Sequence, residues 1–152
     1  GNTIINLMPT NLYGPNDNFD ENSSHVIPGL IARMHKAKLN NSNEFKIWGT
    51  GKPFREFLFV DDFADAVQFI IDNNVNEKLL NVGSGEEISI LDLVELIKEI
   101  IKFEGELVFD LDKPDGNPRK LLDSSKINNL GWSPKTKLRE GIEKTYNWYK
   151  DN

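Results

Sequence analysis

The stretch Thr3-Ile4-Ile5-Asn6-Leu7-Met8 decides the fold class of this chain. It is an apolar run of strand length, and such runs are typical of parallel strands that are covered on both faces. We therefore expect an α/β fold. Because the run has so little sequence before it to pair with, we expect the 152 residues to be the back part of a larger α/β protein. An edge strand in a small α+β domain is the alternative.

Downstream of this strand, apolar residues recur alternately with helix and strand periodicity. We expect a helix at residues 26–38 and another at residues 137–149. We expect a third helix to begin at Asp61 or Asp62 as its cap, and a fourth to follow the capping box formed by Ser89 and Asp92. We expect strands at residues 45–48, 57–60, 79–82 and 107–109. Residues 9–24 read as a long polar loop, and residues 49–52 as a hairpin turn.

Composition narrows the possible partners. The formal net charge of −6 argues against nucleic acid or an anionic membrane as a partner. The chain has no cysteine, and its two histidines are too isolated for a metal site, so we expect no metal. An apolar run of about 20 residues, as a membrane span requires, is absent from the sequence. We expect no signal peptide and a cytoplasmic location.

The run from Lys113 to Asp123, Lys-Pro-Asp-Gly-Asn-Pro-Arg-Lys-Leu-Leu-Asp, is a stiff loop rich in charge. Two prolines and a glycine restrict its backbone. A preordered loop loses less entropy when it binds a ligand. We therefore expect it to clamp a polar, charged ligand, with Leu121 and Leu122 anchoring its far end in a core.

Four further residues are candidates for a ligand site. Arg33 lies on the predicted helix after His25, Trp48 ends a strand and Arg55 precedes another. Guanidinium groups pair with phosphate oxygens and an indole packs on a flat ring, so these three could hold a diphosphate and a base. The alternative is two surface salt bridges and a core tryptophan. His25 stands at a predicted helix start after a long loop, either as a functional residue or as an exposed residue of the cap.

Two motifs typical of dinucleotide enzymes do not fit their surroundings. Tyr146 and Lys150 have the Tyr-x-x-x-Lys spacing of a proton-transfer pair. Tyr146 falls on the apolar stripe of the last helix, however, which favours core packing. Gly83-Ser84-Gly85 lacks the third glycine of a dinucleotide fingerprint, so we expect a plain turn.

Six stretches, in order, carry a resemblance to a known family. They are Pro9-Thr10-Asn11-Leu12-Tyr13-Gly14-Pro15, Ser24-His25-Val26-Ile27-Pro28, Trp48-Gly49-Thr50-Gly51, Arg55-Glu56-Phe57-Leu58-Phe59-Val60-Asp61-Asp62, Asn81-Val82-Gly83-Ser84-Gly85 and the run from Lys113 to Asp123. Together they resemble the C-terminal half of the GDP-L-fucose synthases, a branch of the extended short-chain dehydrogenase/reductase family. Parts of the first and fourth stretches are shared by many nucleotide-sugar enzymes. The second and the last point to this branch.

The resemblance implies a fold and a reaction. The fold would be the last strands of a doubly wound Rossmann-type domain plus a small α/β substrate-binding domain. Residues 1–152 would be the C-terminal part of an epimerase/dehydratase-type protein, with the N-terminal cofactor domain absent from this chain. The family epimerises GDP-4-keto-6-deoxy-mannose at two carbons beside its keto group and then reduces that group with NADPH.

By the same resemblance, His25 would be the catalytic acid that returns a proton to the sugar ring, and it would also contact the cofactor NADP(H). The residues that would line the nicotinamide end of the cofactor are Pro9, Thr10, Asn11 and Leu12. Those that would hold the GDP sugar are Arg33, Trp48, Arg55 and Asp115. The catalytic Ser, Tyr and Lys of the family, its cysteine partner of His25 and its glycine-rich loop would lie upstream of Gly1. We therefore expect this chain alone to be inactive.

Three functions stay open. The first is the substrate-binding part of a GDP-L-fucose synthase. The second is part of another nucleotide-sugar epimerase or dehydratase, which would lack the role of His25 and accept UDP or dTDP sugars. The third is a noncatalytic nucleotide-sugar-binding or subunit-contact module. A GDP sugar is the expected small-molecule partner, and the full-length protein is expected to be a homodimer.

Overall fold

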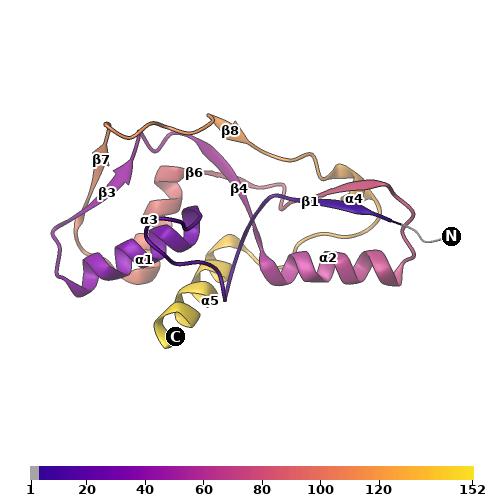
Figure 1. The fold of residues 1–152 in the computed structure, drawn as a ribbon, viewed down its shortest axis with the longest axis horizontal. Helices are drawn as coiled ribbons and strands as arrows, with labels where there is room; N and C mark the ends of the chain where they lie inside the picture. Colours follow the sequence, from indigo (N-terminus) through magenta and orange to yellow (C-terminus); the bar gives the residue numbers. More distant parts are fainter. Residues whose placement is uncertain (1–3) are drawn as a thin grey trace.

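The computed structural model describes residues 4–152, in which helices and strands alternate along the chain (Figure 1). The elements in chain order are β1 (Asn6–Pro9), β2 (Asn11–Tyr13), α1 (Val26–Leu39), β3 (Glu44–Trp48), β4 (Phe54–Phe59), α2 (Val60–Asp72), β5 (Leu79–Val82), β6 (Glu87–Ser89), α3 (Ile90–Ile101), β7 (Glu106–Asp110), β8 (Arg119–Lys120), α4 (Ser125–Asn129) and α5 (Leu138–Asp151). Parallel strand pairs in this alternating order make an α/β fold, as the sequence predicts.

Within residues 4–152, the strands form three small sheets. β1 pairs in parallel with β5, and β3 pairs in parallel with β7. The third sheet is built on β4. The second half of β4 pairs in parallel with β2, and its first half pairs with antiparallel β6 and parallel β8. β4 therefore joins segments that lie far apart in the sequence.

Two hydrophobic clusters use opposite faces of β4. Phe57 and Phe59 belong to a cluster with buried residues of α1, α3 and α5, whereas Leu58 belongs to a second cluster with α2, β5 and α4. Successive side chains of a strand point to opposite faces, so one strand can serve two cores. Figure 1 shows α1, α3 and α5 grouped at one end and α2 and α4 at the other.

The four predicted helices and the four predicted later strands are present, with ends shifted by a few residues. Helix α3 shows why the prediction works. Its residues Val94, Ile97 and Ile101 recur on one face and are buried. Its N-cap Ser89 accepts the backbone N–H of Asp92 at 3.0 Å, so the capping prediction is confirmed at this end.

Two loop predictions are wrong. Residues 9–24 are not one polar loop, because β2 lies within them and its Tyr13 is buried. The turn at residues 49–52 is not a hairpin turn, because β3 pairs with β7 while β4 pairs with β2, β6 and β8. The turn itself is formed, with Gly49 and Gly51 at φ of 73° and 72°, a region that favours glycine.

The predicted cap of α2 is also wrong. The helix begins at Val60, so Asp61 and Asp62 lie inside its first turn. Asp62 is buried, and its carboxyl oxygens accept the backbone N–H groups of Lys135 at 3.3 Å and Thr136 at 2.9 Å. It therefore fixes the loop before α5 instead of capping its own helix.

The opening strand is shorter than predicted and open on one face. Within the predicted stretch, Thr3 lies outside the described residues and β1 begins at Asn6. Ile5 and Leu7 pack against the second cluster, but Ile4 is 77% and Met8 53% exposed. The predicted burial of β1 on both faces is therefore not found within residues 4–152, where β5 is the strand that pairs with β1.

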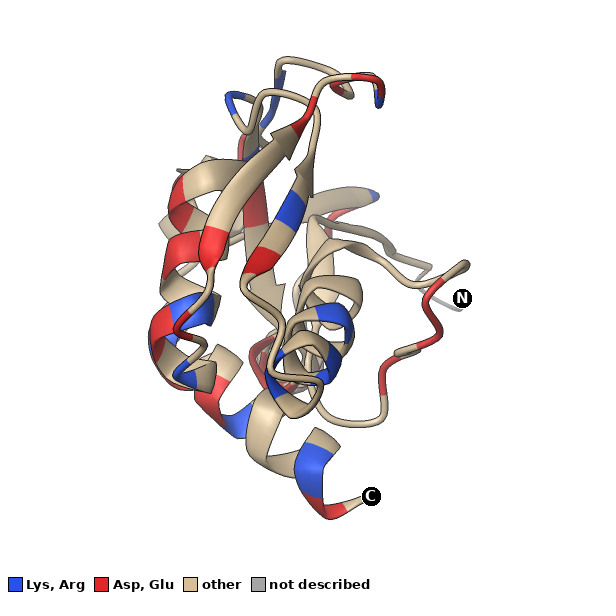
Figure 2. Ribbon diagram, turned by 90° about the vertical axis from the view of Figure 1, so that its left-hand side faces the viewer, with Lys and Arg blue, Asp and Glu red and all other residues tan. Residues whose placement is uncertain are grey.

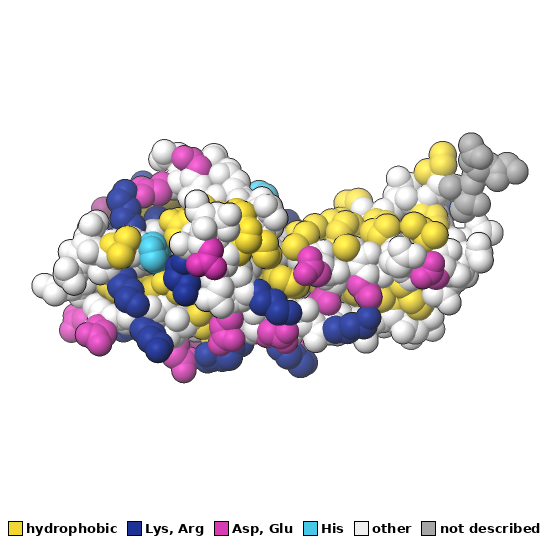
Figure 3. Space-filling view, turned by 90° about the horizontal axis from the view of Figure 1, so that it is seen from below, with side chains coloured by type: hydrophobic (Ala, Val, Ile, Leu, Met, Phe, Trp, Pro, Cys, Tyr) yellow, Lys and Arg dark blue, Asp and Glu magenta, His cyan; other side chains and the backbone are white. Residues whose placement is uncertain are grey.

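The surface mixes charges and carries an apolar band. Figure 2 shows basic and acidic residues interspersed over helices and strands. Figure 3 shows hydrophobic side chains along the half of the molecule that carries α2, where Val60, Val67 and Ile71 recur on one helix face and are not fully buried. The described helices include none that is long and apolar enough to cross a membrane.

Candidate functional site

A cleft of about 320 Å³ lies between α1, the β3–β4 turn and the loop after β7. Five residues that the sequence singles out line it together: His25, Arg33, Trp48, Arg55 and Asp115. They come from four parts of the chain, namely α1 with its N-cap, β3, β4 and the loop after β7, and the fold brings these parts together. The remaining lining is mostly apolar, with backbone from the glycine turns, as in sites that bury a ligand and orient it with a few polar groups.

His25 is the N-cap residue of α1, where the sequence places it. Its side chain is exposed and makes no capping hydrogen bond, so the imidazole is free to face a ligand. Gly29, in the first turn of α1, lets the preceding loop approach closely. A Cβ atom at this position would lie 2.5 Å from Oγ of Ser24. Ser24 and His25 both line the cleft at this point.

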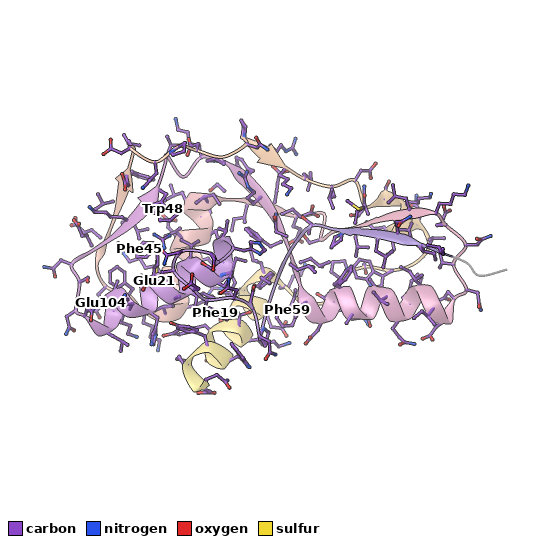
Figure 4. All side chains as sticks on the ribbon, in the orientation of Figure 1. Phe19, Glu21, Phe45, Trp48, Phe59 and Glu104 are labelled. Atoms are coloured by element: carbon purple, nitrogen blue, oxygen red, sulfur yellow. The ribbon has the colours of Figure 1, made fainter. Side chains whose placement is uncertain are left out.

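Arg33 and Trp48 form a cationic and aromatic wall of the cleft. The guanidinium carbon of Arg33 lies 4.6 Å from the ring centroid of Trp48 and 5.1 Å from that of Phe45. Figure 4 labels both aromatic residues near β3 and α1. The Lys113 ammonium lies 5.9 Å from the Trp48 ring. Trp48 is 53% exposed, so the alternative of a core tryptophan is wrong.

Burial lowers the pKa of Arg33, and the nearby Glu21 carboxylate raises it. Arginine stays protonated near neutral pH even so. Within the structure, Nη1 donates a long hydrogen bond of 3.4 Å to the Lys46 carbonyl. Neither Arg33 nor Arg55 has an ion-pair partner among residues 4–152, which removes the salt-bridge alternative there. Most N–H donors of Arg33 are thus open to an anion.

Arg55 holds the loop after β7 over the cleft. Its Nη1 donates to the carbonyl of Phe54 at 2.7 Å and to that of Asn117 at 2.6 Å. Gly116 lies directly against it, since a Cβ atom there would be 2.8 Å from Nη2 of Arg55. Arg55, which is predicted to bind a ligand, therefore also stabilises the clamp loop, residues 113–123.

Asp115 latches the same loop onto the β3–β4 turn. Its Oδ1 accepts the Thr50 N–H at 2.8 Å and its Oδ2 accepts the Thr50 hydroxyl at 2.7 Å. The side-chain bond and then the backbone bond from Thr50 lower the pKa of Asp115. Gly49 is required beside it, because a Cβ atom would lie 2.2 Å from Oδ1.

The prediction that Leu121 anchors the far end of this loop in a core is wrong, since Leu121 is 39% exposed.

Four of the five predicted cofactor residues lie outside this cleft: Pro9 and Thr10 at the carboxyl end of β1, and Asn11 and Leu12 at the start of β2. Pro9 is exposed, and the N–H of Thr10 donates to the Val82 carbonyl at 3.0 Å. None of the residues 9–12 lines the cleft that contains His25. In open α/β sheets, ligands bind outside the carboxyl ends of parallel strands. Residues 9–12 therefore lie at a place that suits a cofactor, although they do not line the cleft that contains His25.

Sequence reasoning missed Glu56. Its side chain is fully buried, and its carboxyl group accepts backbone N–H groups from two distant loops. The sequence does contain one sign of its role, since Glu56 directly precedes three apolar residues of the same strand. Alternation gives such a residue a solvent-facing position, whereas β4 is covered on both faces here.

The rejected Tyr-x-x-x-Lys motif is structural. Tyr146 is buried, its hydroxyl lies 3.0 Å from Nδ1 of His35, and desolvation raises its pKa. The Lys150 ammonium lies over its ring at 4.9 Å. Core packing is thus confirmed for Tyr146. Residues 4–152 contain no group of three or more acidic, histidine or cysteine side chains that could hold a metal ion.

Residues 1–83, more than half of the chain, match the sequence model of the NAD dependent epimerase/dehydratase family. The chain belongs to this family. Among relatives, it is 56% identical over 152 residues to the probable GDP-L-fucose synthase 1 of Oryza sativa subsp. japonica, covering all of this chain and 46% of that protein. It is 42% identical to the GDP-L-fucose synthase of Escherichia coli strain K12, covering 50% of that protein.

A solved family structure agrees with these matches. The GDP-L-fucose synthetase from Naegleria fowleri bound to NADP superposes with a TM-score of 0.90 at 32% identity, over 97% of this chain and 47% of that one. The resemblance expected from the six sequence stretches is therefore confirmed. The chain spans about half the length of the family relatives that it matches.

Proposed function

We propose that the chain is the C-terminal, substrate-binding part of a GDP-L-fucose synthase, which converts GDP-4-keto-6-deoxy-D-mannose to GDP-L-fucose. The observation that carries this proposal is the convergence of His25, Arg33, Trp48, Arg55 and Asp115 on one cleft. The names of the two relatives given above support it, since one is a probable GDP-L-fucose synthase and the other a GDP-L-fucose synthase.

The cleft offers what a GDP sugar requires. Arg33 presents N–H donors that pair with diphosphate oxygens, and Trp48 presents an exposed indole face that packs on a flat ring. Arg55 sits where it reaches both the ligand and the loop carbonyl of Asn117. The loop that carries Asp115 closes over the bound nucleotide as a preformed clamp.

His25 supplies an acid at the rim of this cleft. A ketone acidifies the C–H bonds beside it, so a base removes a proton from one ring face and an acid returns one to the other. Imidazole exists in both protonation states near neutral pH and can donate that proton. The free, exposed ring at the start of α1 is compatible with this role.

NADPH, when bound, supplies the hydride that reduces the keto group. The residues proposed to hold its nicotinamide end are Pro9 and Thr10, at the carboxyl end of β1, and Asn11 and Leu12, at the start of β2. Residues 1–152 would then combine the last elements of a cofactor domain with the substrate domain. We further propose that the full-length protein is a homodimer and that this chain alone is inactive.

The test is nucleotide binding by the full-length protein that contains this chain, measured by titration calorimetry with GDP, UDP and dTDP. We expect GDP to bind at least about 10-fold more tightly than UDP, the discrimination that one or two additional hydrogen bonds to the base provide. Equal binding of all three would favour another nucleotide-sugar epimerase. Tight GDP binding without NADPH-dependent turnover of the keto sugar would favour a noncatalytic binding module.

A further inference from the structure

Glu56 has no exposed surface, although its side chain ends in a carboxyl group. It lies in β4 between Arg55, which lines the cleft, and Phe57, which is in register with Asn11 of β2. A buried carboxyl group costs free energy unless hydrogen-bond donors surround it. The identity of those donors therefore shows what this position connects.

The side chain of Glu56 joins two loops. Its Oε1 accepts the N–H of Gly85 at 2.8 Å, and its Oε2 accepts the N–H of Leu122 at 3.0 Å. Gly83 lies against the carboxyl group, since a Cβ atom there would be 2.3 Å from Oε1. Leu122 ends the loop whose other part, at Asp115, closes the cleft. The carboxyl group thus fixes the far end of the clamp to the turn after β5.

The main chain of Glu56 joins a third segment. Its carbonyl oxygen accepts the Thr10 hydroxyl at 3.2 Å and the side-chain amide of Asn11 at 2.8 Å. Both belong to the segment proposed to line the nicotinamide end of the cofactor. One buried residue therefore contacts the proposed cofactor segment and the far end of the proposed substrate clamp.

We propose that Glu56 is a positioning residue that couples occupation of the GDP-sugar cleft to the placement of residues 10–12. This inference rests on the proposed function. A nucleotide that engages Arg55 and the loop of residues 113–123 acts on Leu122, whose N–H is bonded to the Glu56 carboxyl group. Any resulting shift of the Glu56 backbone reaches Thr10 and Asn11 directly through hydrogen bonds. Such a link is a coupling free energy between two sites, and it is reciprocal.

The Glu56→Gln variant weakens the side-chain part of the link, to Gly85 and Leu122, with little change of volume, and keeps the main-chain bonds to Thr10 and Asn11. Glutamine has one acceptor oxygen, so its NH₂ group must face one of the two N–H donors. The matched control is Asp62→Asn. Asp62 is also buried, and its carboxyl group also accepts two backbone N–H groups, but from the loop before α5 and outside the cleft. Both variants therefore lose similar bonds, and only one of them lies between the two sites.

The experiment measures the affinity of the full-length protein for NADP⁺ with and without saturating GDP. In the wild type and in Asp62→Asn, we expect GDP to strengthen NADP⁺ binding by ~10-fold; in Glu56→Gln, we expect the effect to fall below about 2-fold. Absence of coupling in the wild type, retention of coupling in Glu56→Gln, or its equal loss in Asp62→Asn would each overturn the inference. If GDP does not bind the wild type, the proposed function itself fails.

A second measurement needs no variant, and so it also applies if Glu56→Gln does not fold. Amide hydrogen exchange of the wild-type protein is followed with GDP alone, in the absence of NADP⁺. We expect slower exchange at the Leu122 and Gly85 amides and, by coupling, at residues 10–12. If GDP binds and leaves exchange at residues 10–12 unchanged, the link through Glu56 does not exist.

Discussion

Replacement of Arg33 by methionine is predicted to weaken GDP binding without unfolding the protein. Methionine retains an unbranched side chain that packs against Trp48 and Phe45, but it removes the guanidinium charge. In the structure, that charge makes one long hydrogen bond, to the Lys46 carbonyl at 3.4 Å. Its contribution is therefore available mainly to a bound anion.

The size of the effect follows from these contacts. A hydrogen bond to a charged group contributes about 1.5–3 kcal/mol, so loss of one bond to the diphosphate weakens binding by about 10- to 150-fold. The variant also loses the cation–π contacts with Trp48 and Phe45, each worth about 0.5–1 kcal/mol of folding stability at an exposed site. That corresponds to a fall in melting temperature of only a few degrees.

The assay is titration calorimetry of GDP with the full-length protein, alongside thermal unfolding. Arg139→Met is the control, because Arg139 pairs with Glu99 and Glu143 on the surface and lies outside the cleft. The control is expected to bind GDP as the wild type does. Wild-type affinity in Arg33→Met would show that Arg33 is a packing residue and would refute the assignment of the diphosphate site.

Three further predictions test other parts of the molecule. In the full-length protein, His25→Gln should slow incorporation of solvent deuterium into the sugar ring by ~100- to 10,000-fold; incorporation at the wild-type rate would leave His25 a helix-start residue only. Because the two bonds from Thr50 lower the pKa of Asp115 from its usual 3.8, their stabilisation is fully present above pH 3.8 and is lost as the pH falls through the lowered pKa. The NMR shift of the Thr50 amide should therefore titrate with a midpoint below 3.8, and a midpoint at or above 3.8 would contradict the latch. In the isolated chain, Leu7 should exchange its amide hydrogen rapidly while Thr10, bonded to β5, is protected; equal strong protection in a monomer would argue against an open edge at β1.

The sequence predicts the elements that local periodicity defines. The residues Val94, Ile97 and Ile101 of α3 mark one buried face because a helix repeats every 3.6 residues, and this needs no knowledge of the rest of the fold. Strand pairing is not local. Gly49 and Gly51 form the expected turn, yet the partner of β3 is β7, some 60 residues further on. The short strands β2, β6 and β8 exist only through such distant partners.

The site divides in the same way. Residue type alone suggests Arg33, Trp48 and Arg55 as ligands for a diphosphate and a base and leaves the role of His25 open, and the resemblance adds specific roles for His25 and Asp115. Nothing local shows that Asp115 reaches Thr50, because the two residues meet only when the loop folds over the β3–β4 turn. The partners of buried polar groups are likewise set by the assembled fold.

Because both faces of β4 pack in specific surroundings, this strand tolerates no change in its length. Arg55 and Phe57 face one side, and Glu56 and Leu58 the other. Insertion or deletion of a single residue within the strand would exchange these faces and place each side chain in the wrong surroundings. Relatives of this chain should therefore accommodate insertions in surface loops such as residues 40–43, while β4 keeps its length. A related sequence with an insertion or deletion inside β4 is expected to lack this cleft.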